Sequence, residues 1–462
     1  MRHPAAPRSR LSRELRATAW LSAPLVVGQL SSMGMNVVNT VLAGTHGTET
    51  LAAIGIGAPA WSVVILLCIG VLMALLPTVA QLAGAGQRDA IGPVFRQALW
   101  LALAMGVTLF AVMRLAPLVL GGFIAPEVMP GVTAFLHGIS WGAPALAFYF
   151  CLRYVAEGVA WTVPTMVIGA SGLVVLLPLG WALMDGWGAL PQLDAGGLGL
   201  ATALVLWLQV TAMALTLSRS RRCADLALFK RFDWPNPAVI GQLLRLGVPM
   251  GLAIFMEGSL FIATALLIAT LGTIPIAAHQ VAILAASVAF MVPLGVAMGT
   301  TVRVGQAAGA GDAEGVRFAA RAGWIIGLVT QTASALLLVL GGAWLASLIS
   351  DDAEVIGLAA GLMLFAAVFQ YTDGLQAVSA GALRGLKDTR IPAFVTIFSY
   401  WGLGLPIGAF LGGVAHRGVP VFGLGLGPTG YWIGLIVGLS VAAVLLTWRF
   451  QTLSSRDLRP MA

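Results

Sequence analysis

Long apolar segments recur along this chain from one end to the other, and they leave little choice of fold. Each has roughly 20 or more residues, the length that a helix needs to cross about 30 Å of hydrocarbon. Polar, glycine-rich or proline-rich breaks separate the segments, so the sequence predicts about twelve membrane-spanning helices with short connections. The predicted spans are 15–43, 51–76, 93–120, 131–152, 160–184, 195–218, 239–268, 276–302, 316–348, 355–381, 391–413 and 423–449.

Composition points to lipid as the solvent of most of the chain. Of the 462 residues 59% are hydrophobic and 9% are charged, and the mean hydropathy is +0.94. A soluble domain carries about 25% charged residues. The net charge of +7 lies in short loops rather than on an extended basic face, so we expect no nucleic-acid partner. The three cysteines do not form a disulfide framework and are expected to be free thiols.

The positions of basic residues predict the orientation in the membrane. Of 25 Lys and Arg, about 23 fall at the two termini, in the even-numbered loops or at the span ends next to these loops, the exceptions being Arg114 and Arg417. Short loops rich in Lys and Arg stay on the cytoplasmic side. We therefore expect a multi-pass protein of the cell (inner) membrane with both termini in the cytoplasm. The basic N-terminus precedes an apolar run too long for a signal peptide, which indicates an uncleaved first span.

The two halves of the sequence resemble each other. Shifting the sequence by 225 residues places Pro24 on Pro249, and the register continues without gaps to Gly86 on Gly311. About 19 of these 63 positions are identical, which indicates a repeated architecture. Since each copy starts on the same side, the sequence predicts an all-α protein with two six-helix lobes, related by a parallel pseudo-twofold repeat. The expected parts are an N-terminal lobe (1–218), a cytoplasmic linker (219–238) and a C-terminal lobe (239–462).

Two carboxylates lie inside predicted spans, whereas nearly all of the other acidic residues fall in loops or at span ends. Glu257 lies in the seventh span and Asp373 in the tenth. A charge in hydrocarbon costs at least about 2.5–3.5 kcal/mol and is tolerated where it faces a polar cavity or a partner. Each residue could instead be a structural hydrogen-bonder between helices. Because no Lys or Arg is expected inside the spans, a mobile cation, Na⁺ or H⁺, is the simplest partner for the pair.

Further polar side chains are candidates for contacts with cation or substrate. Thr372 adjoins Asp373, and Gln280 could present an amide to a cleft between the lobes. Asp351 and Asp352 lie in the outer loop between spans nine and ten. They either cap the start of a helix or form an acidic mouth that attracts cationic solutes.

Several classes of protein are excluded by motifs that the chain lacks. Neither lysine follows a glycine, so there is no Walker A loop for ATP, and neither an HExxH pair nor a Gly-x-Ser-x-Gly elbow occurs. A major-facilitator transporter would share the parallel repeat, but the second loop lacks the expected Gly-Asp-Arg-type signature. We expect no enzyme and no cofactor, and a purely structural scaffold would not need two buried carboxylates.

Several segments together resemble the multidrug and toxic compound extrusion (MATE) transporters of the NorM-type branch. The resemblance covers nearly the whole chain, and its most specific segments are GVPMGLAIFMEGSLF, IAAHQVAILAASVAFMVPLGVAMGTTVRVGQAAGAGD and FQYTDGLQAVSAGALRGLKDTRIP. It implies an exporter of organic cations driven by inward Na⁺ or H⁺. The seventh-helix glutamate of the family matches Glu257 and its tenth-helix aspartate matches Asp373.

The resemblance also gives roles to other residues and shows one departure. Gln280 matches a polar position of the cavity, and Asp351 and Asp352 match an outer acidic pair implicated in drug contact. The first-helix aspartate of the family is Asn39 here, and an amide cannot titrate. Asn39 is therefore expected to contact substrate at most, and cation coupling is expected in the C-terminal lobe alone.

These observations combine into one expected function. The chain is expected to be a secondary multidrug exporter that works by alternating access as a monomer in the lipid bilayer. Its expected substrates are amphipathic organic cations, which would compete with Na⁺ or H⁺ for Glu257 and Asp373. The alternative is a flippase for a lipid-linked precursor, which would need a strongly cationic central cavity that the sequence does not indicate.

Overall fold

A computed structural model of the chain describes residues 7–187, 191–416 and 419–455. Within these ranges, eleven helices are long and apolar enough to cross a membrane. A twelfth candidate span consists of α5 (Met129–Ser140) and α6 (Ala143–Gly158), which meet at a bend of 43°. The prediction of an all-α membrane protein with about twelve spans is confirmed.

The described residues form two compact units. The N-terminal unit comprises Val27–Gly251, and the C-terminal unit comprises the described residues up to Val26 and from Leu252 onward. The division passes through α1 (Pro7–Thr45) and α9 (Pro237–Ala269), two residues after Pro24 and Pro249 respectively. These two prolines coincide in the sequence repeat, and each removes one backbone hydrogen bond from its helix. The packing units therefore differ from the sequence-ordered lobes.

The N-terminal unit consists of helices. The part of α1 from Val27 is followed by helices whose bounds are α2 (Thr48–Leu72), α3 (Leu75–Gly84), η1 (Arg88–Ala90), α4 (Ile91–Leu120), α5, α6, α7 (Val163–Asp185), α8 (Asp194–Arg219) and η2 (Arg221–Leu226). The helix α8 packs on α5, α6 and α7, and α4 packs on α5 and α6.

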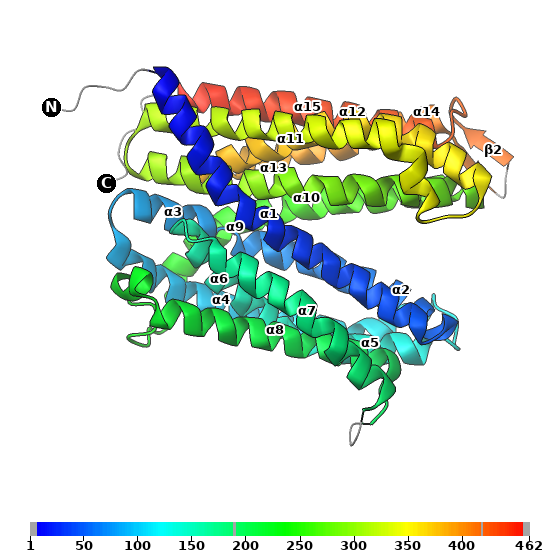
Figure 1. Ribbon diagram of the computed structural model, residues 1–462, viewed down its shortest axis with the longest axis horizontal. Coiled ribbons are helices and arrows are strands. Elements are labelled where there is room, and N and C mark those ends of the chain that lie inside the picture. The colour runs from blue at the N-terminus through cyan, green and yellow to red at the C-terminus, as the bar shows by residue number, and fades with distance from the viewer. Residues whose placement is uncertain (1–6, 188–190, 417–418, 456–462) are drawn as a thin grey trace. The chain divides into compact units, whose positions relative to one another are not determined.

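The C-terminal unit contains the rest of the chain (Figure 1). After α9 come α10 (Thr273–Gly309), α11 (Ala313–Ser347), α12 (Ala353–Gly385), α13 (Arg390–Ile397), η3 (Phe398–Gly404), α14 (Leu405–Gly412), the short strands β1 (Val414–His416) and β2 (Val419–Phe422), and α15 (Pro428–Ser454). The helix α12 packs against α10, α11 and α15 at the centre of this unit. The two strands form an antiparallel hairpin.

Glycines bring η3 and α14 close to α15. Gly404, Gly408 and Gly412 recur at every fourth residue, and so do their facing partners on α15, which are Gly430, Gly434 and Gly438. A Cβ atom on Gly434 would collide with the backbone of Gly408, and one on Gly430 would collide with that of Gly412. Such stripes of small residues let helices approach closely where lipid provides no hydrophobic driving force. We call this contact the glycine ladder.

The sequence repeat recurs in the local structure. Gly86 and Gly311, which coincide in the repeat, both end a helix with positive φ, at 75° and 68°. Gly47 and Gly272 also coincide, and both precede a helix with φ of 114° and 127°. A residue with a side chain is strained in these conformations, so both copies retain glycine.

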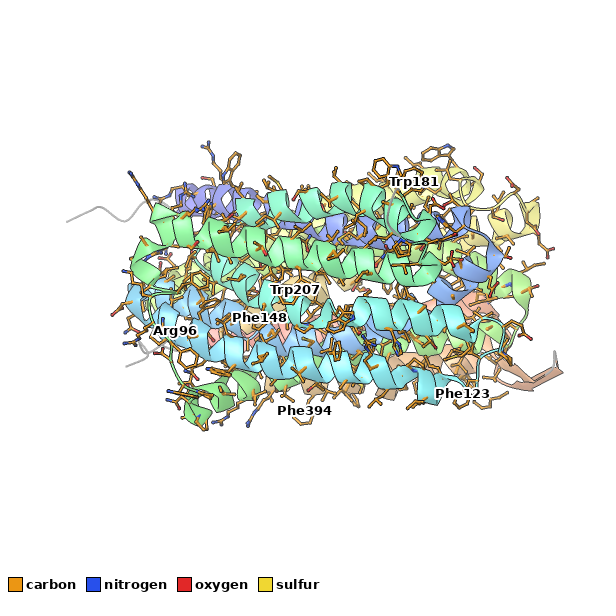
Figure 2. All side chains as sticks on the ribbon, turned by 90° about the horizontal axis from the view of Figure 1, so that it is seen from below. Arg96, Phe123, Phe148, Trp181, Trp207 and Phe394 are labelled. Atoms are coloured by element: carbon orange, nitrogen blue, oxygen red, sulfur yellow. The ribbon has the colours of Figure 1, made fainter. Side chains whose placement is uncertain are left out.

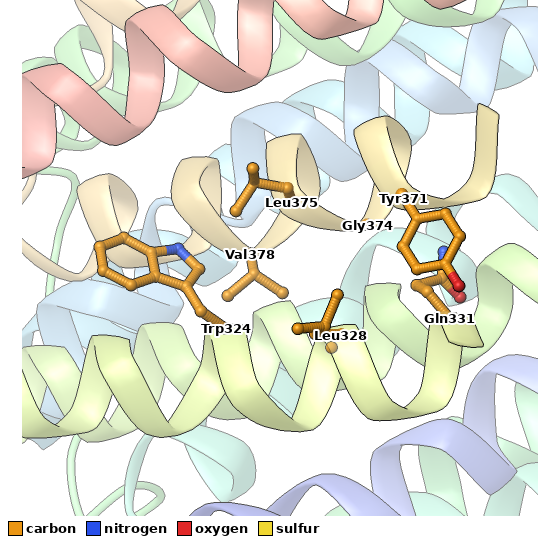
Figure 3. Close-up of a pocket in the computed structure, with 8 residues that line it drawn as sticks. Trp324, Leu328, Gln331, Tyr371, Gly374, Leu375 and Val378 are labelled. Carbon is orange, nitrogen blue, oxygen red and sulfur yellow. The ribbon is translucent and has the colours of Figure 1, made fainter. Parts of the chain in front are cut away.

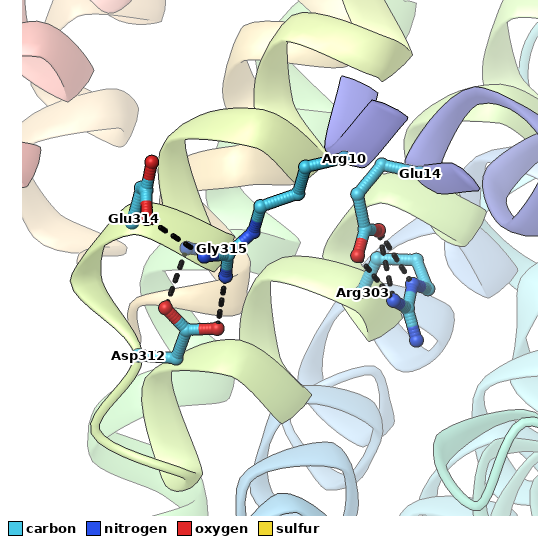
Figure 4. A network of polar contacts seen from close by, with 6 residues as sticks. All are labelled: Arg10, Glu14, Arg303, Asp312, Glu314 and Gly315. Atoms are coloured by element: carbon cyan, nitrogen blue, oxygen red, sulfur yellow. Dashed lines mark hydrogen bonds and ion pairs between the residues drawn. The ribbon is translucent and has the colours of Figure 1, made fainter. Parts of the chain in front are cut away.

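Ion pairs fasten the first turns of α1 to the connection between α10 and α11 within the C-terminal unit (Figure 4). Arg10 pairs with Asp312 and with Glu314, the latter at 2.7 Å, and Arg303 pairs with Glu14 at 2.8 Å. These contacts explain why the start of α1 belongs to the C-terminal unit.

A corresponding set of ion pairs lies within the N-terminal unit. Arg96 pairs with Asp233 just before α9, and Arg88 pairs with Asp225 in η2, both at 2.5 Å. The Arg88 guanidinium holds the pKa of Asp225 below its usual value through a direct hydrogen bond. The segment that leads into α9 is thereby tied to the N-terminal unit.

Many large apolar side chains are exposed. Phe123, Trp181, Trp207 and Phe394, labelled in Figure 2, are between 42% and 88% exposed. In water such a surface would drive aggregation, but in a bilayer it faces hydrocarbon. The exposed apolar surface and the helix lengths together identify a multi-pass membrane protein.

Candidate functional site

Glu257 on α9 and Asp373 on α12 lie in the same unit. Asp373 is 3% exposed, and its Oδ1 atom has no hydrogen-bond partner in the described part of the chain. Glu257 is partly buried, and the two carboxyl groups interact electrostatically. The structure therefore brings together the two carboxylates that the sequence singles out. Two such groups cannot both remain ionised in an apolar interior unless a cation or a proton offsets their charge.

Tyr400 on η3 is a third polar group in this region that sequence reasoning missed. It is fully buried, its hydroxyl has no hydrogen-bond partner among the described residues, and it interacts electrostatically with both carboxyl groups. In the sequence it is one aromatic residue in an apolar span, a description that fits many others. Its proximity to the carboxylates becomes visible only in three dimensions.

Thr372 and Gln280, the two neutral residues predicted near the carboxylates, differ in their surroundings. The Thr372 hydroxyl donates to the carbonyl of Phe369 on its own helix at 2.9 Å, which leaves its oxygen lone pairs available. Gln280 is exposed on α10, whereas Asp373 and Tyr400 are buried. Contacts of Thr372 and Gln280 with cation or substrate stay predictions.

Asp351 and Asp352 are both exposed between α11 and α12. Asp352 is the N-cap of α12, and its Oδ1 accepts hydrogen bonds from the backbone amides of Glu354 at 2.8 Å and Val355 at 3.3 Å. The capping role explains an aspartate at position 352. Contact of this acidic pair with drugs stays a prediction.

Asn39 belongs to the N-terminal unit, whereas both carboxylates belong to the C-terminal unit. It is 6% exposed, and its Oδ1 has no hydrogen-bond partner in the described residues. It lines a cavity of about 340 Å³ between α1 and α2, to which Asn36, Thr40 and Ser62 also contribute. An unpaired amide oxygen beside an open space can accept a hydrogen bond from a ligand, but it cannot carry a proton in the physiological range.

A buried ion pair lies on α6, beyond the end of the predicted span 131–152. The helix continues past the predicted span end to Gly158 and includes Arg153 and Glu157. Their side chains are 5% and 0% exposed and pair at 2.6 Å, and Arg153 also donates to Gln29 at 2.8 Å. The sequence could have indicated this pair by its i,i+4 spacing. Because the two charges offset each other, the pair needs no mobile ion.

The expectation of no basic group near the two carboxylates also needs correction. The helix α12 runs to Gly385, beyond the predicted end of its span, and so includes Arg384. Arg384 interacts electrostatically with Glu257, while its Nε donates to the carbonyl of Ala380. This guanidinium offsets part of one negative charge.

A second cavity, of about 260 Å³, lies between α11 and α12 (Figure 3). Its walls are mostly apolar, with Trp324, Leu328 and Leu375 among the lining residues. Gln331 also lines it but is already engaged, since its Nε2 donates to the carbonyl and side-chain oxygens of Gln370. The Tyr371 hydroxyl donates to Thr332 at 3.2 Å, and no carboxylate of the described residues lines the cavity, so it is a poor candidate for a cation site.

Comparison with known proteins identifies relatives over nearly the whole chain. Residues 24–182 and 249–410 match the model of a family described as MatE, and these two segments begin at the equivalent prolines of the repeat. A probable multidrug resistance protein NorM of Xanthomonas campestris is 51% identical over 448 residues, covering 97% of this chain and 96% of that protein. The multidrug resistance protein PmpM of Pseudomonas aeruginosa is 39% identical over 464 residues, covering 99% and 96%.

Solved structures share the fold. The crystal structure of the eukaryotic MATE transporter AtDTX14 superposes with a TM-score of 0.85 at 20% identity, covering 95% of this chain and 96% of that one. An outward-facing multidrug resistance MATE transporter of the MOP superfamily gives the same TM-score and identity, covering 98% and 99%.

Proposed function

This chain belongs to the MATE family, as a transporter of the NorM type and not an enzyme, and from this premise we propose that it exports amphipathic organic cations. Export is coupled to inward movement of Na⁺ or H⁺. Relatives named as multidrug resistance proteins support a range of drugs as substrates.

One observation carries the proposed coupling mechanism. Asp373 is buried with an unpartnered Oδ1 and interacts electrostatically with Glu257 in the same unit. A cation that binds there relieves the repulsion, and a cationic drug can relieve it as well. If the two ligands favour different conformations and exclude each other, the inward gradient of one drives export of the other.

The chemistry of the site suits either coupling ion. Carboxylate and hydroxyl oxygens are the ligands of hard cations such as Na⁺. A buried carboxyl group also takes up a proton readily, because burial disfavours its charged form.

A flippase for a lipid-linked precursor has less support. Such a flippase would need unpaired cationic side chains to hold a pyrophosphate. The buried cations Arg153 and Arg96 are instead paired, with Glu157 and Asp233.

The proposed location is the inner membrane of a bacterial cell, with both termini in the cytoplasm and the monomer as the functional unit. The charge distribution of the loops supports the orientation. The orientation is tested with single cysteines introduced at position 5 and at position 426, which are labelled from outside intact cells. We expect the cysteine at position 426 to react and the cysteine at position 5 to be protected.

The test of coupling is efflux of a fluorescent organic cation from proteoliposomes that contain the purified protein. A Na⁺ gradient and a pH gradient are imposed separately. We expect one of them to accelerate efflux several-fold over liposomes without a gradient. Efflux that follows neither gradient would overturn the coupling mechanism.

A further inference from the structure

We propose that the hydroxyl oxygen of Tyr400 is a third oxygen of the coupling site, where it accepts the cation or the proton that the carboxyl pair carries. This inference rests on the coupling role proposed above for Glu257 and Asp373. Tyr400 would then help to set how tightly the driving cation binds.

Burying the Tyr400 hydroxyl costs free energy unless a ligand satisfies it. The side chain is fully buried, and its hydroxyl lacks a partner in the described part of the chain. An unsatisfied buried polar group costs about 1–3 kcal/mol, so phenylalanine would be the more stable choice if the oxygen had no ligand. The unpartnered Oδ1 of Asp373 presents the same difficulty, and both groups belong to the C-terminal unit.

Tyr400 belongs to the same apolar cluster as residues of the two helices that carry the carboxylates. One apolar cluster contains Tyr400 together with Leu260, one turn from Glu257 on α9, and Phe369, one turn from Asp373 on α12. The hydroxyl interacts electrostatically with both carboxyl groups. Tyr400 on η3 therefore shares its buried surroundings with residues of α9 and α12.

The backbone around Tyr400 is irregular in a way that suits a ligand-binding role. Residues Phe398–Gly404 form a π-helix between the regular helices α13 and α14. Such segments are rare and occur frequently at functional sites. The next residue, Trp401, donates from Nε1 to the carbonyl of Met256 at 3.2 Å, which ties η3 to the residue before Glu257.

The glycine ladder also holds this segment in place. Gly404, the last residue of η3, approaches the Cα atom of Gly438 on α15 closely enough that a Cβ atom would lie 3.2 Å from it. The π-helix is thus held to α9 by the Trp401 hydrogen bond and to α15 by close glycine contacts. A fixed segment can hold an oxygen ligand at a defined position.

The test compares Tyr400→Phe with wild type in proteoliposomes. The measured quantities are the concentration of driving cation, Na⁺ or H⁺, that gives half-maximal efflux, and the maximal rate. Loss of one oxygen ligand should raise the half-maximal concentration by about tenfold, as expected for a hydrogen bond to a charged group. The maximal rate should stay within about twofold of wild type. A second readout, cation displacement of a bound fluorescent drug from the purified protein, should shift by the same factor.

Tyr431→Phe is the matched control. Tyr431 is also a buried tyrosine of this unit, but its hydroxyl donates to the carbonyl of Gly413 at 2.8 Å. We expect this variant to lose stability without a change in cation dependence. If Tyr400→Phe does not fold, Trp401→Phe, which removes the tie to Met256, should shift the cation dependence in the same direction by a smaller factor.

The results separate this inference from the function on which it rests. Cation dependence of Tyr400→Phe equal to that of wild type, with a raised melting temperature, would show that the hydroxyl is an unused buried group and overturn the inference. Wild-type protein that shows no cation-driven efflux would overturn the proposed function itself.

Discussion

Glu257 and Asp373 approach each other from α9 and α12 without a neutralising partner for Asp373 Oδ1 in the described residues. Arg384 offsets part of the charge of Glu257. The negative charge that remains favours a bound cation. Because glutamine and asparagine have the same shape without the charge, the fold should tolerate them at these two positions.

We predict that Glu257→Gln and Asp373→Asn each reduce cation-driven efflux by about tenfold or more, because each removes a charged ligand from a low-dielectric site. Expression should stay near wild type, and the melting temperature should be equal or higher because one repulsion is removed. The measurement is gradient-driven efflux at matched protein levels. Transport at the wild-type rate in both variants would refute the assignment of the site.

Asn39 allows a separate test of the N-terminal unit. Because its amide does not titrate, we predict that Asn39→Ala leaves the half-maximal concentration of driving cation within about twofold of wild type. Efflux is measured for this variant and for Asn39→Asp across a pH series. If the alanine variant folds normally and loses cation-driven efflux, the N-terminal unit takes part in coupling.

From the sequence alone, a residue can be singled out only where it breaks a strong local pattern. Glu257 and Asp373 stand out because carboxylates are costly within apolar segments. Tyr400 could not be found in this way, because tyrosine is compatible with an apolar helix and its neighbours come from other helices. Arg153 and Glu157 were missed for a different reason, since they lie where hydropathy falls and the helix nevertheless continues.

At the scale of elements, the helices extend beyond the apolar segments that predict them. The helix α6 continues to Gly158 with an internal ion pair, and α12 continues to Gly385 with Arg384 in its last turn. Hydropathy marks the part of a helix that lies in hydrocarbon, whereas the helix itself ends where its backbone hydrogen bonds end. The bend between α5 and α6 was also not predicted, although Gly142 and Pro144 lie at it.

The glycine ladder gives a prediction about stability. In Gly434→Ala the new Cβ atom would meet the backbone of Gly408, so α14 and α15 must separate. Overpacking of this kind costs about 1–3 kcal/mol, and we expect a lower melting temperature in detergent.

Gly357→Ala on α12 is the control, because a Cβ atom there meets open space. Alanine in an exposed helix is favoured over glycine by about 0.8–1.0 kcal/mol, so this variant should be as stable as wild type or more stable. Equal melting temperatures for Gly434→Ala and wild type would contradict the close contact.

At the scale of the whole molecule, the repeat and the packing units divide the chain differently. The first turns of α1 are tied by Arg10 and Glu14 to the C-terminal unit, and the segment before α9 is tied by Asp225 and Asp233 to the N-terminal unit. The repeat was visible in the sequence. The assignment of the start of α1 to the C-terminal unit was not, because it depends on ion pairs between residues far apart in the chain. The chain passes from one unit to the other within α1 and within α9, close to Pro24 and Pro249.

We propose that the driving cation and the drug compete for Glu257 and Asp373. This competition is tested most directly by equilibrium binding of a fluorescent organic cation to the purified protein, titrated with Na⁺ and separately with acid. For wild type we predict that the dissociation constant of the drug rises about tenfold or more as the driving cation saturates its site. For the double variant Glu257→Gln/Asp373→Asn it should no longer depend on that cation. A wild-type dissociation constant unaffected by both Na⁺ and pH would contradict the account.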